Sequence, residues 1–307
     1  TKKRNSLDSL HQSVRSSFTS RGYSEVITYS FIEDSAASLI EPKMKKLVSV
    51  NNPISQNMII MRPSLLPGLL NTVSYNQNQG IDQIKIFEIG SIFQKSSINK
   101  IKETEWIGGL ISGLKAKHSW SGSKRPLDFF DLKGDVESIL GDSSGYVFKK
   151  GKLPYLHPGK TAFIFKGNNQ IGYIGSLHPK LVDELDLKQD VHFFEIQVEK
   201  ISLNRKVKFR NFSRFPLAQR DLSFILDQGI PSSEVKGIIS SKAGRNLKEI
   251  NLFDIYEGKG IPSGKKSLTF SLNWQAADRT LTDKEIDDIV EKIVKFLSKR
   301  FSAKLRV

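Results

Sequence analysis

The chain has 307 residues, a formal charge of +15 and no cysteine. Disulfide frameworks and cysteine-based zinc sites are therefore excluded. No apolar run approaches the roughly 20 residues that cross a bilayer, and no apolar segment follows the basic start Thr1–Arg4, as a secretory signal would require. We expect a cytoplasmic protein with no membrane partner. Because Met is not the first residue, we also expect a piece of a longer protein.

The positive charge is concentrated toward the end of the chain. Residues 207–307 contain 19 Lys and Arg and 12 Asp and Glu, whereas residues 1–206 contain 28 and 20. The last third therefore carries nearly half of the excess. This charge favours a nucleic-acid partner. A solvated, lysine-rich surface explains it equally well.

Length predicts two domains, and a polar, basic stretch that ends at Phe215-Pro216 suggests the boundary between them. We place the domains at 1–206 and 207–307.

In the first domain, an apolar stripe of Leu7, Leu10, Val14 and Phe18 predicts a helix. Further elements are expected as strand 26–32, helix 64–79, strands 84–93 and 106–111, helix 129–140, strands 161–166 and 170–176 around the hairpin signal Gly167-Asn168-Asn169, and strand 192–198. These elements predict an α+β domain with a largely antiparallel sheet and helices packed on it.

The second domain shows a regular alternation of strands and helices. Strands are expected at 220–227, 247–256, 265–274 and 303–307. Ser232 or Ser233 is expected to cap a first helix, and a capping box of Thr282 and Glu285 opens a second helix. The order β-α-β-β-α-β predicts a ferredoxin-like domain.

Several short motifs follow one another along both domains. In the first domain they are 22–31 (GYSEVITYSF), 61–70 (MRPSLLPGLL), 75–78 (YNQN), 87–90 (FEIG), 129–137 (FFDLKGDVE) and 174–179 (IGSLHP). In the second they are Phe215-Pro216, 220–222 (RDL), 252–256 (LFDIY), 264–268 (GKKSL) and 279–281 (RTL). No one of these motifs is decisive alone, but their combination in this order is specific. Together they resemble one protein family, the bacterial β subunit of phenylalanyl-tRNA synthetase, in its C-terminal part.

The resemblance implies a class II synthetase-like antiparallel sheet with flanking helices, followed by a ferredoxin-fold anticodon-binding domain. The expected function is that of a subunit of phenylalanine–tRNA ligase, with the α subunit and tRNA-Phe as partners. A β–β contact is possible in an (αβ)₂ assembly. ATP and Mg²⁺ would serve the whole enzyme, and this segment would bind no cofactor.

The aminoacylation site is expected to lie outside this chain. Class II synthetases hold the phosphates of the adenylate with arginines, one before a Glu in a strand and one after a glycine motif. Here no Arg precedes Glu88, and Ser176 rather than Arg follows the glycine pair Gly172 and Gly175. We therefore predict no catalytic residues in this chain.

Charged and titratable residues of the first domain give no prediction of a ligand site. The five histidines show no metal-ligand spacing, so no metal site is expected. Glu88 is expected to be a buried, paired carboxylate rather than a ligand contact. Arg62 is equally suited to an ion pair across a subunit interface and to bonds with local carbonyls.

The anticodon site is inferred from the second domain. Tyr256 follows a strand and precedes a glycine-rich loop, where its ring is positioned to stack on an unpaired base, although a half-buried strand Tyr fits the pattern as well. The resemblance implies that Tyr256 is the stacking platform and that Ser267 and Ser223 line its pocket. Because the family often has a small apolar residue at the position of Ser223, a backbone contact is the alternative there. The basic residues expected to hold phosphates are Arg220, Lys265, Lys266 and Arg279.

Two other functions remain open from the sequence. One is a single-chain organellar phenylalanyl-tRNA synthetase, against which the missing arginines argue. The other is a free-standing RNA-binding protein. ATP–pyrophosphate exchange by the chain alone favours the first, and purification without an α partner favours the second.

Overall fold

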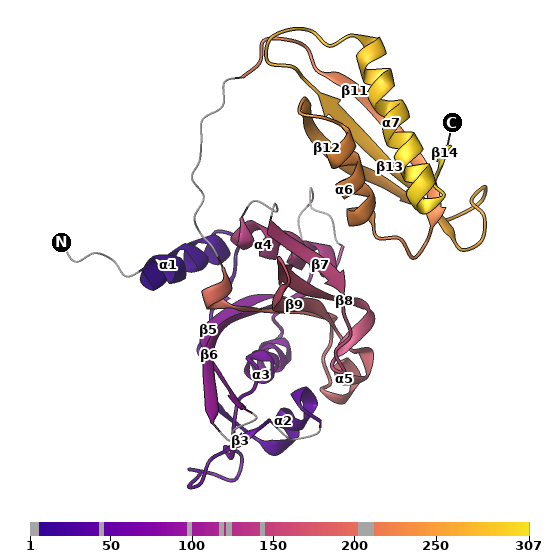
Figure 1. Cartoon of the computed structure of the whole chain (residues 1–307). Coiled ribbons are helices and arrows are strands. Elements are labelled where there is room, and N and C mark those ends of the chain that lie inside the picture. The colour runs from indigo at the N-terminus through magenta and orange to yellow at the C-terminus, as the bar shows by residue number, and fades with distance from the viewer. Residues whose placement is uncertain are drawn as a thin grey trace, which may run out of the picture. The chain divides into compact units, whose positions relative to one another are not determined.

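The structure is a computed structural model that describes residues 6–42, 46–96, 100–116, 120, 125–141, 145–201 and 212–306. The chain divides into two compact units, residues 1–206 and 207–307. The boundary expected between 206 and 207 lies within 202–211, outside the described residues. Figure 1 shows each unit as a sheet with packed helices. None of the described helices is long and apolar enough to cross a membrane.

Unit 1 is built on a seven-stranded sheet in the order β1-β5-β6-β10-β9-β8-β7. All neighbouring pairs are antiparallel except β1 and β5. The strands are β1 (Ser24–Glu25), β5 (Gln83–Lys95), β6 (Ile101–Gly113), β7 (Tyr146–Lys150), β8 (Leu156–Lys166), β9 (Asn169–Leu177) and β10 (Val191–Gln197).

Helices cover both faces of this sheet. On one face, α1 (Ser6–Thr19) and α4 (Phe129–Leu140) pack around Phe87, Ile174 and Phe194. On the other face, α3 (Leu66–Asn78) packs on residues such as Ile86 and Phe193, inside the curve of β5 and β6 (Figure 1). Because adjacent strand residues point to opposite faces, Ile86 and Phe87 enter different cores. The sheet is therefore the centre of a three-layer domain.

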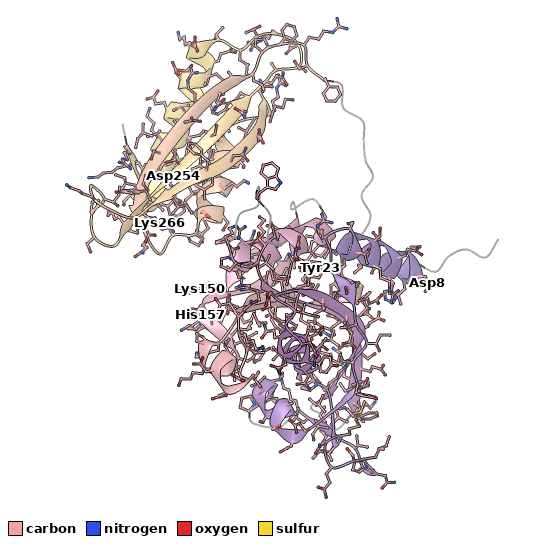
Figure 2. The ribbon with its side chains drawn as sticks, turned by 180° about the vertical axis from the view of Figure 1, so that it is seen from behind. Asp8, Tyr23, Lys150, His157, Asp254 and Lys266 are labelled. Carbon is pink, nitrogen blue, oxygen red and sulfur yellow. The ribbon has the colours of Figure 1, made fainter. Side chains whose placement is uncertain are left out.

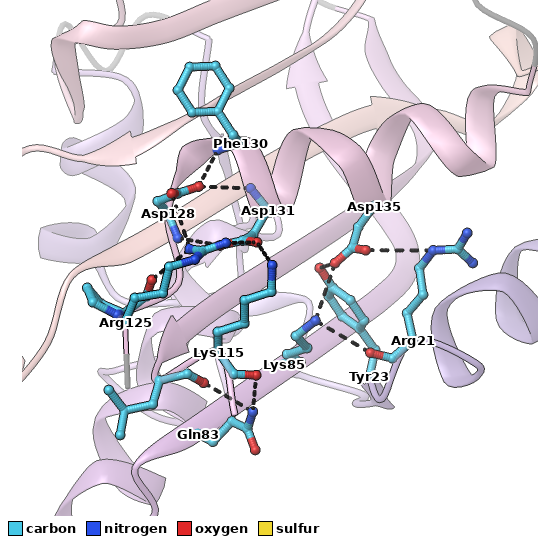
Figure 3. A network of polar contacts seen from close by, with 12 residues as sticks. Arg21, Tyr23, Gln83, Lys85, Lys115, Arg125, Asp128, Phe130, Asp131 and Asp135 are labelled. Carbon is cyan, nitrogen blue, oxygen red and sulfur yellow. Dashed lines mark hydrogen bonds and ion pairs between the residues drawn. The ribbon is translucent and has the colours of Figure 1, made fainter. Parts of the chain in front are cut away.

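The start of α4 is fixed by a charged network. Asp128 caps the helix by accepting from the Phe130 and Asp131 amides, and the Asp131 side chain accepts from the Asp128 amide. Arg125 donates to both oxygens of Asp131 at 2.6 and 2.7 Å, and this pairing holds the pKa of the Asp131 carboxyl well below its ordinary value. Figure 3 shows this network and the neighbouring one around Asp135. Together they anchor α4 over the sheet.

A small three-stranded sheet, β2-β4-β3, lies beside the main sheet. It consists of β2 (Phe31–Ile32), β3 (Val48–Ser49) and β4 (Ile60–Met61), with α2 (Asp34–Ile40) packed against it. The short α5 (Pro179–Glu184) and the 3-10 turn η2 (Val198–Lys200) complete unit 1.

Unit 2 is a four-stranded antiparallel sheet in the order β12-β13-β11-β14. Its elements follow the predicted sequence of β11 (Ala218–Asp227), α6 (Ser232–Lys242), β12 (Leu247–Tyr256), β13 (Lys265–Trp274), α7 (Asp283–Phe301) and β14 (Lys304–Arg306). Both helices pack on one face, around Phe224, Phe270 and Trp274. The ferredoxin-like prediction is confirmed.

Two local predictions were wrong. Residues 26–30 do not form a strand, because after the bond from the Val26 amide to the Phe87 carbonyl the side chain of Thr28 turns inward to Glu88. Neither Ser232 nor Ser233 caps α6, which begins after Pro231 without a side-chain cap bond.

Candidate nucleic-acid interface

The face of the unit 2 sheet that bears no helix is lined by polar side chains. On β13 the even positions from Leu268 to Trp274 enter the core, so the odd positions from Lys265 to Asn273 lie on the open face. Strand pairing extends this face across the sheet. Tyr256 of β12 lies opposite Ser267, Asp227 opposite Lys265, and Arg306 of β14 opposite Ser223.

Tyr256, Ser267 and Ser223 lie together on this face. The hydroxyl oxygens of Ser223 and Ser267 are 2.9 Å apart, and that of Ser223 is 3.2 Å from the Thr269 hydroxyl. Ser267 is completely buried, whereas 38% of Tyr256 is exposed. The structure therefore presents a partly open aromatic ring above a layer of linked hydroxyl groups.

The loop after β12 holds the Tyr256 ring in place. The Tyr256 hydroxyl donates to the Lys259 carbonyl at 3.3 Å. A Cβ atom at Gly258 would come within 2.6 Å of the Tyr256 hydroxyl oxygen, so any other residue there would displace the ring. Glycine at 258 thus allows the ring to lie against its own loop.

Positive charge lies beside the ring on the open face. The Arg306 guanidinium carbon is 5.6 Å from the centroid of the Tyr256 ring, within cation–π range. Lys304 is on the same face, opposite Ile225. Lys265 is two residues before Ser267 and is the next open-face residue of β13. The Lys265 ammonium is 3.7 Å from Asp227, an exposed and weak pair. An aromatic ring with flanking cations suits a single-stranded nucleic acid.

Three of the predicted phosphate contacts lie elsewhere. Arg220 is opposite Leu272, on the helix-covered face, and its guanidinium is 2.7 Å from Asp283 of α7. Lys266 has the same facing, opposite Leu226. Arg279 pairs with Glu285 at the start of α7, beyond the far end of β13, roughly 20 Å along the strand from Ser267 at about 3.3 Å per residue.

The open face also carries residues that the sequence did not suggest. Arg306 and Lys304 come from the last strand, and their facing depends on the pairing of β14 with β11. Asp254 lies opposite Thr269, two residues before Tyr256, and is labelled in Figure 2. A β-bulge between Leu252 and Asp254 shifts the register, so alternation counted from the core residue Leu252 would place Asp254 on the wrong face.

Unit 1 presents an apolar groove. The groove has a volume of about 640 Å³ and lies between the 27–33 segment and α3. Among its lining residues, Ile27 is 94%, Tyr29 73% and Tyr75 66% exposed. Among the described residues no group of three His, Cys, Asp or Glu side chains is arranged to hold a metal ion.

Comparison with known proteins assigns both units. Residues 1–198 match the family "Phenylalanyl tRNA synthetase beta chain CLM domain", and residues 213–306 match "Ferredoxin-fold anticodon binding domain". The chain belongs to the phenylalanyl-tRNA synthetase β-chain family. The resemblance inferred from the sequence is confirmed.

Two similar proteins illustrate how much of the family this chain represents. The phenylalanine–tRNA ligase β subunit of Pseudomonas fluorescens (strain Pf-5) is 37% identical over 95% of this chain and 37% of its own length. That of Coxiella burnetii is 36% identical over 95% of this chain and 37% of its own length. The chain therefore spans little more than a third of the curated relatives it matches. Among solved structures, a pyrrolysyl tRNA synthetase from Desulfitobacterium hafniense gives a TM-score of 0.49 at 17% identity, over 64% of this chain and 68% of that chain.

Proposed function

We propose that this chain acts as a β-subunit portion of phenylalanine–tRNA ligase, with unit 2 reading the anticodon of tRNA-Phe and unit 1 serving as a non-catalytic scaffold for the α subunit. The observation that carries the proposal is the open face of unit 2, where an accessible Tyr256 ring lies over linked hydroxyl groups and beside unburied cations. The match of unit 1 to a phenylalanyl-tRNA synthetase beta-chain domain and that of unit 2 to an anticodon-binding domain support it.

The open face suits recognition of an unpaired anticodon base. A base that stacks on the Tyr256 ring gains roughly 1–3 kcal/mol without regard to its identity. The hydroxyl of Ser223 and the Asp254 carboxylate are within the same part of the sheet and provide groups that hydrogen-bond a base edge. The Ser223 backbone is paired within the sheet, because β11 lies between β13 and β14. Lys265 lies beside them as a phosphate contact. Ser267 is buried beneath this layer, so it supports Ser223 rather than meeting the base first.

The geometry leaves only one of the four basic residues that were predicted to contact phosphates. Arg220 and Arg279 already pair with carboxylates of α7, and Lys266 faces the helix side. We therefore assign phosphate contacts to Lys265, together with Arg306 and Lys304, and leave the other three out of the pocket.

The apolar groove of unit 1 is the surface proposed for the α subunit. Ile27 and Tyr29 are exposed and line one groove with Tyr75. They therefore form a continuous apolar patch and are not isolated apolar side chains on the surface. Obligate interfaces commonly bury such apolar surface. ATP and Mg²⁺ are assigned to the α subunit, and a β–β contact would complete an (αβ)₂ enzyme.

Anticodon binding is tested by Tyr256→Ala in the α/β enzyme against an anticodon stem-loop across a salt series. We expect a loss of roughly 1–3 kcal/mol with little change in the salt slope, because stacking is not an ionic contact. Tyr256→Phe keeps the ring and should bind nearly as tightly as the parent. Phe253→Ala removes another exposed aromatic side chain of β12 and serves as the matched control. If Tyr256→Ala binds as the parent does, the pocket is misplaced.

The scaffold role is tested by Ile27→Asp. Because Ile27 is 94% exposed, the substitution should leave folding unchanged and should abolish co-purification with the α subunit. Ile101→Asp, at a position that is 61% exposed and outside the groove, is the control. A chain that purifies from its own cell without any α partner would point to a free-standing RNA-binding protein. ATP–pyrophosphate exchange by the chain alone would point to a single-chain synthetase.

A further inference from the structure

Unit 1 contains a long stretch that is basic throughout. Residues 143–182 include six lysines and no Asp or Glu. With 32 acidic residues in 307, a stretch of this length would be expected to hold about four. Its described part, residues 145–182, forms the meander β7-β8-β9 at the end of the seven-stranded sheet and the start of α5. The charge imbalance is therefore gathered in one structural element.

Four of these lysines surround the outer edge of the sheet and form what we call the basic rim, which consists of Lys149, Lys150, Lys152 and Lys160. All four are exposed, and none has a carboxylate within ion-pair distance among the described residues. Lys149 and Lys150 are neighbours on β7, the edge strand, and so extend on either side of the same edge. Figure 2 places Lys150 on the outer rim of unit 1.

Strand pairing brings the remaining lysines to the same rim. Lys150 lies opposite Ala162, and the Gly151 amide donates to the Thr161 carbonyl at 3.1 Å. This pairing places Lys152, just after β7, next to Lys160, just before Thr161. Both strands of the hairpin therefore contribute lysines to one positive surface at its closed end.

Aromatic rings lie among the cations. The Lys149 ammonium is 4.8 Å from the centroid of the Phe165 ring, and the Lys166 ammonium is 5.6 Å from that of Tyr146. Such contacts reduce the freedom of the long side chains. Lys149, which is ordered in this way and has no carboxylate within ion-pair distance among the described residues, is suited to an external polyanion.

We propose that the basic rim is a second RNA-binding surface, which contacts the phosphate backbone of the tRNA outside the anticodon. This inference rests on the proposed function for the identity of the polyanion, and it adds a site in unit 1 that is separate from the open face of unit 2. The rim offers lysines and no set of base-edge readers, so it contributes salt-dependent affinity and no sequence preference.

Protection of a sheet edge is the competing explanation, because lysines on edge strands prevent strand pairing between molecules. It accounts for Lys149 and Lys150 on β7. It does not account for the absence of acidic residues over the whole meander, which includes strands β8 and β9.

The test is the triple substitution Lys149→Ala, Lys150→Ala and Lys152→Ala in the α/β enzyme. Binding is measured across a salt series with a full-length tRNA-Phe transcript and with its anticodon stem-loop. Each lost phosphate contact reduces the magnitude of the negative slope of log K against log salt by about 0.7 to 0.9. For the full-length tRNA we therefore expect this magnitude to decrease by about 2. The triple variant should bind the anticodon stem-loop with the same affinity and salt slope as the parent enzyme. The three Lys→Arg substitutions should preserve the slope.

The matched control is the triple Lys95→Ala, Lys100→Ala and Lys102→Ala. It removes the same charge from exposed positions of unit 1 that lie close to Glu103 and Glu105. Equal effects of both triples, or an unchanged slope accompanied by self-association of the rim variant, would overturn the proposal in favour of general charge or edge protection. If Tyr256→Ala loses binding while the rim variant binds as the parent does, the proposed anticodon function stands and only the rim proposal is rejected.

Discussion

The two units use antiparallel sheets in different ways. In unit 1, α1 and α4 cover one face of the sheet and α3 covers the other, whereas in unit 2 both helices cover the same face. A sheet enclosed on both faces has no open surface for a ligand, so unit 1 can bind partners only at its edges and grooves. A sheet enclosed on one face leaves a broad polar surface, which is where the proposed anticodon site lies.

The difference extends to buried polar groups. The buried charged side chains of the described residues, Arg62, Glu88 and Glu195, are all in unit 1, as is the buried His192. In unit 2 the only buried polar residue among those described is Ser267. Unit 1 therefore depends on internal ionic and hydrogen-bonded networks, and unit 2 on an apolar core with exposed ion pairs.

The largest expected effect tests this dependence in unit 1. The Arg62 guanidinium is 2.7 Å from Glu88 and also donates to the Ser91 carbonyl at 2.9 Å. Arg62→Ala leaves Glu88 buried without its partner, which should lower the free energy of unfolding by about 3–5 kcal/mol. Hydrogen exchange should show this loss of protection in β5 and no change in β13.

A double variant separates the charge from the packing. Arg62→Met with Glu88→Leu replaces both ions by apolar side chains and should be less harmful than Arg62→Ala alone. If Arg62→Ala is as stable as the parent, the Arg62–Glu88 pair is hydrated. Unit 1 then does not depend on buried ionic groups, and it does not differ from unit 2 in this respect.

The second effect concerns pH and Glu195. Burial raises the pKa of this carboxyl to about 7, although the Tyr173 hydroxyl, the Leu65 amide and the Ser64 hydroxyl donate to it. A carboxyl whose pKa is raised on folding stabilises the fold most below its unfolded value of about 4.5. This contribution, on the order of 3 kcal/mol, is lost as the pH rises from about 4.5 to 7.

Comparison with Glu195→Gln isolates this titration, because the other groups titrate alike in both proteins. The free energy of unfolding of the parent, relative to the Gln variant, should decrease over that pH range and then level off. An increase with pH would show instead that the donors at the start of α3 favour the carboxylate.

The sequence predicted unit 2 more completely than unit 1. The bounds of β12 and β13 agree with prediction because β13 alternates regularly and both strands end at glycine loops or polar turns. In unit 1, strands β5, β6 and β10 were recognised from their apolar content, but β7 was missed because it is short and lysine-rich. The stretch 26–30 was predicted as a strand because its residues favour strands, but the inward bond of Thr28 to Glu88 overrides that preference.

The grouping of Tyr256, Ser223 and Ser267 was predicted through the family resemblance. The three residues do lie together, because strands β12, β13 and β11 are adjacent in the sheet. Arg306 joins them only through the pairing of β14 with β11, which motif spacing does not reveal. Arg220 was included because it precedes Asp221 and Leu222, yet facing alternates along a strand and puts it on the other side.

The smallest expected effect compares the two faces of the unit 2 sheet directly. Arg220→Ala removes an exposed ion pair with Asp283, which is worth at most about 1 kcal/mol of stability. Because Arg220 lies on the helix-covered face, the affinity for an anticodon stem-loop and its salt slope should remain those of the parent. Lys265→Ala removes the same charge from the open face. It should reduce the magnitude of the salt slope by a fraction of a unit, up to about 0.7, whatever the sequence of the RNA. Parallel salt series for the two variants decide the matter, since equal changes in slope would mean that the anticodon loop reaches beyond the open face.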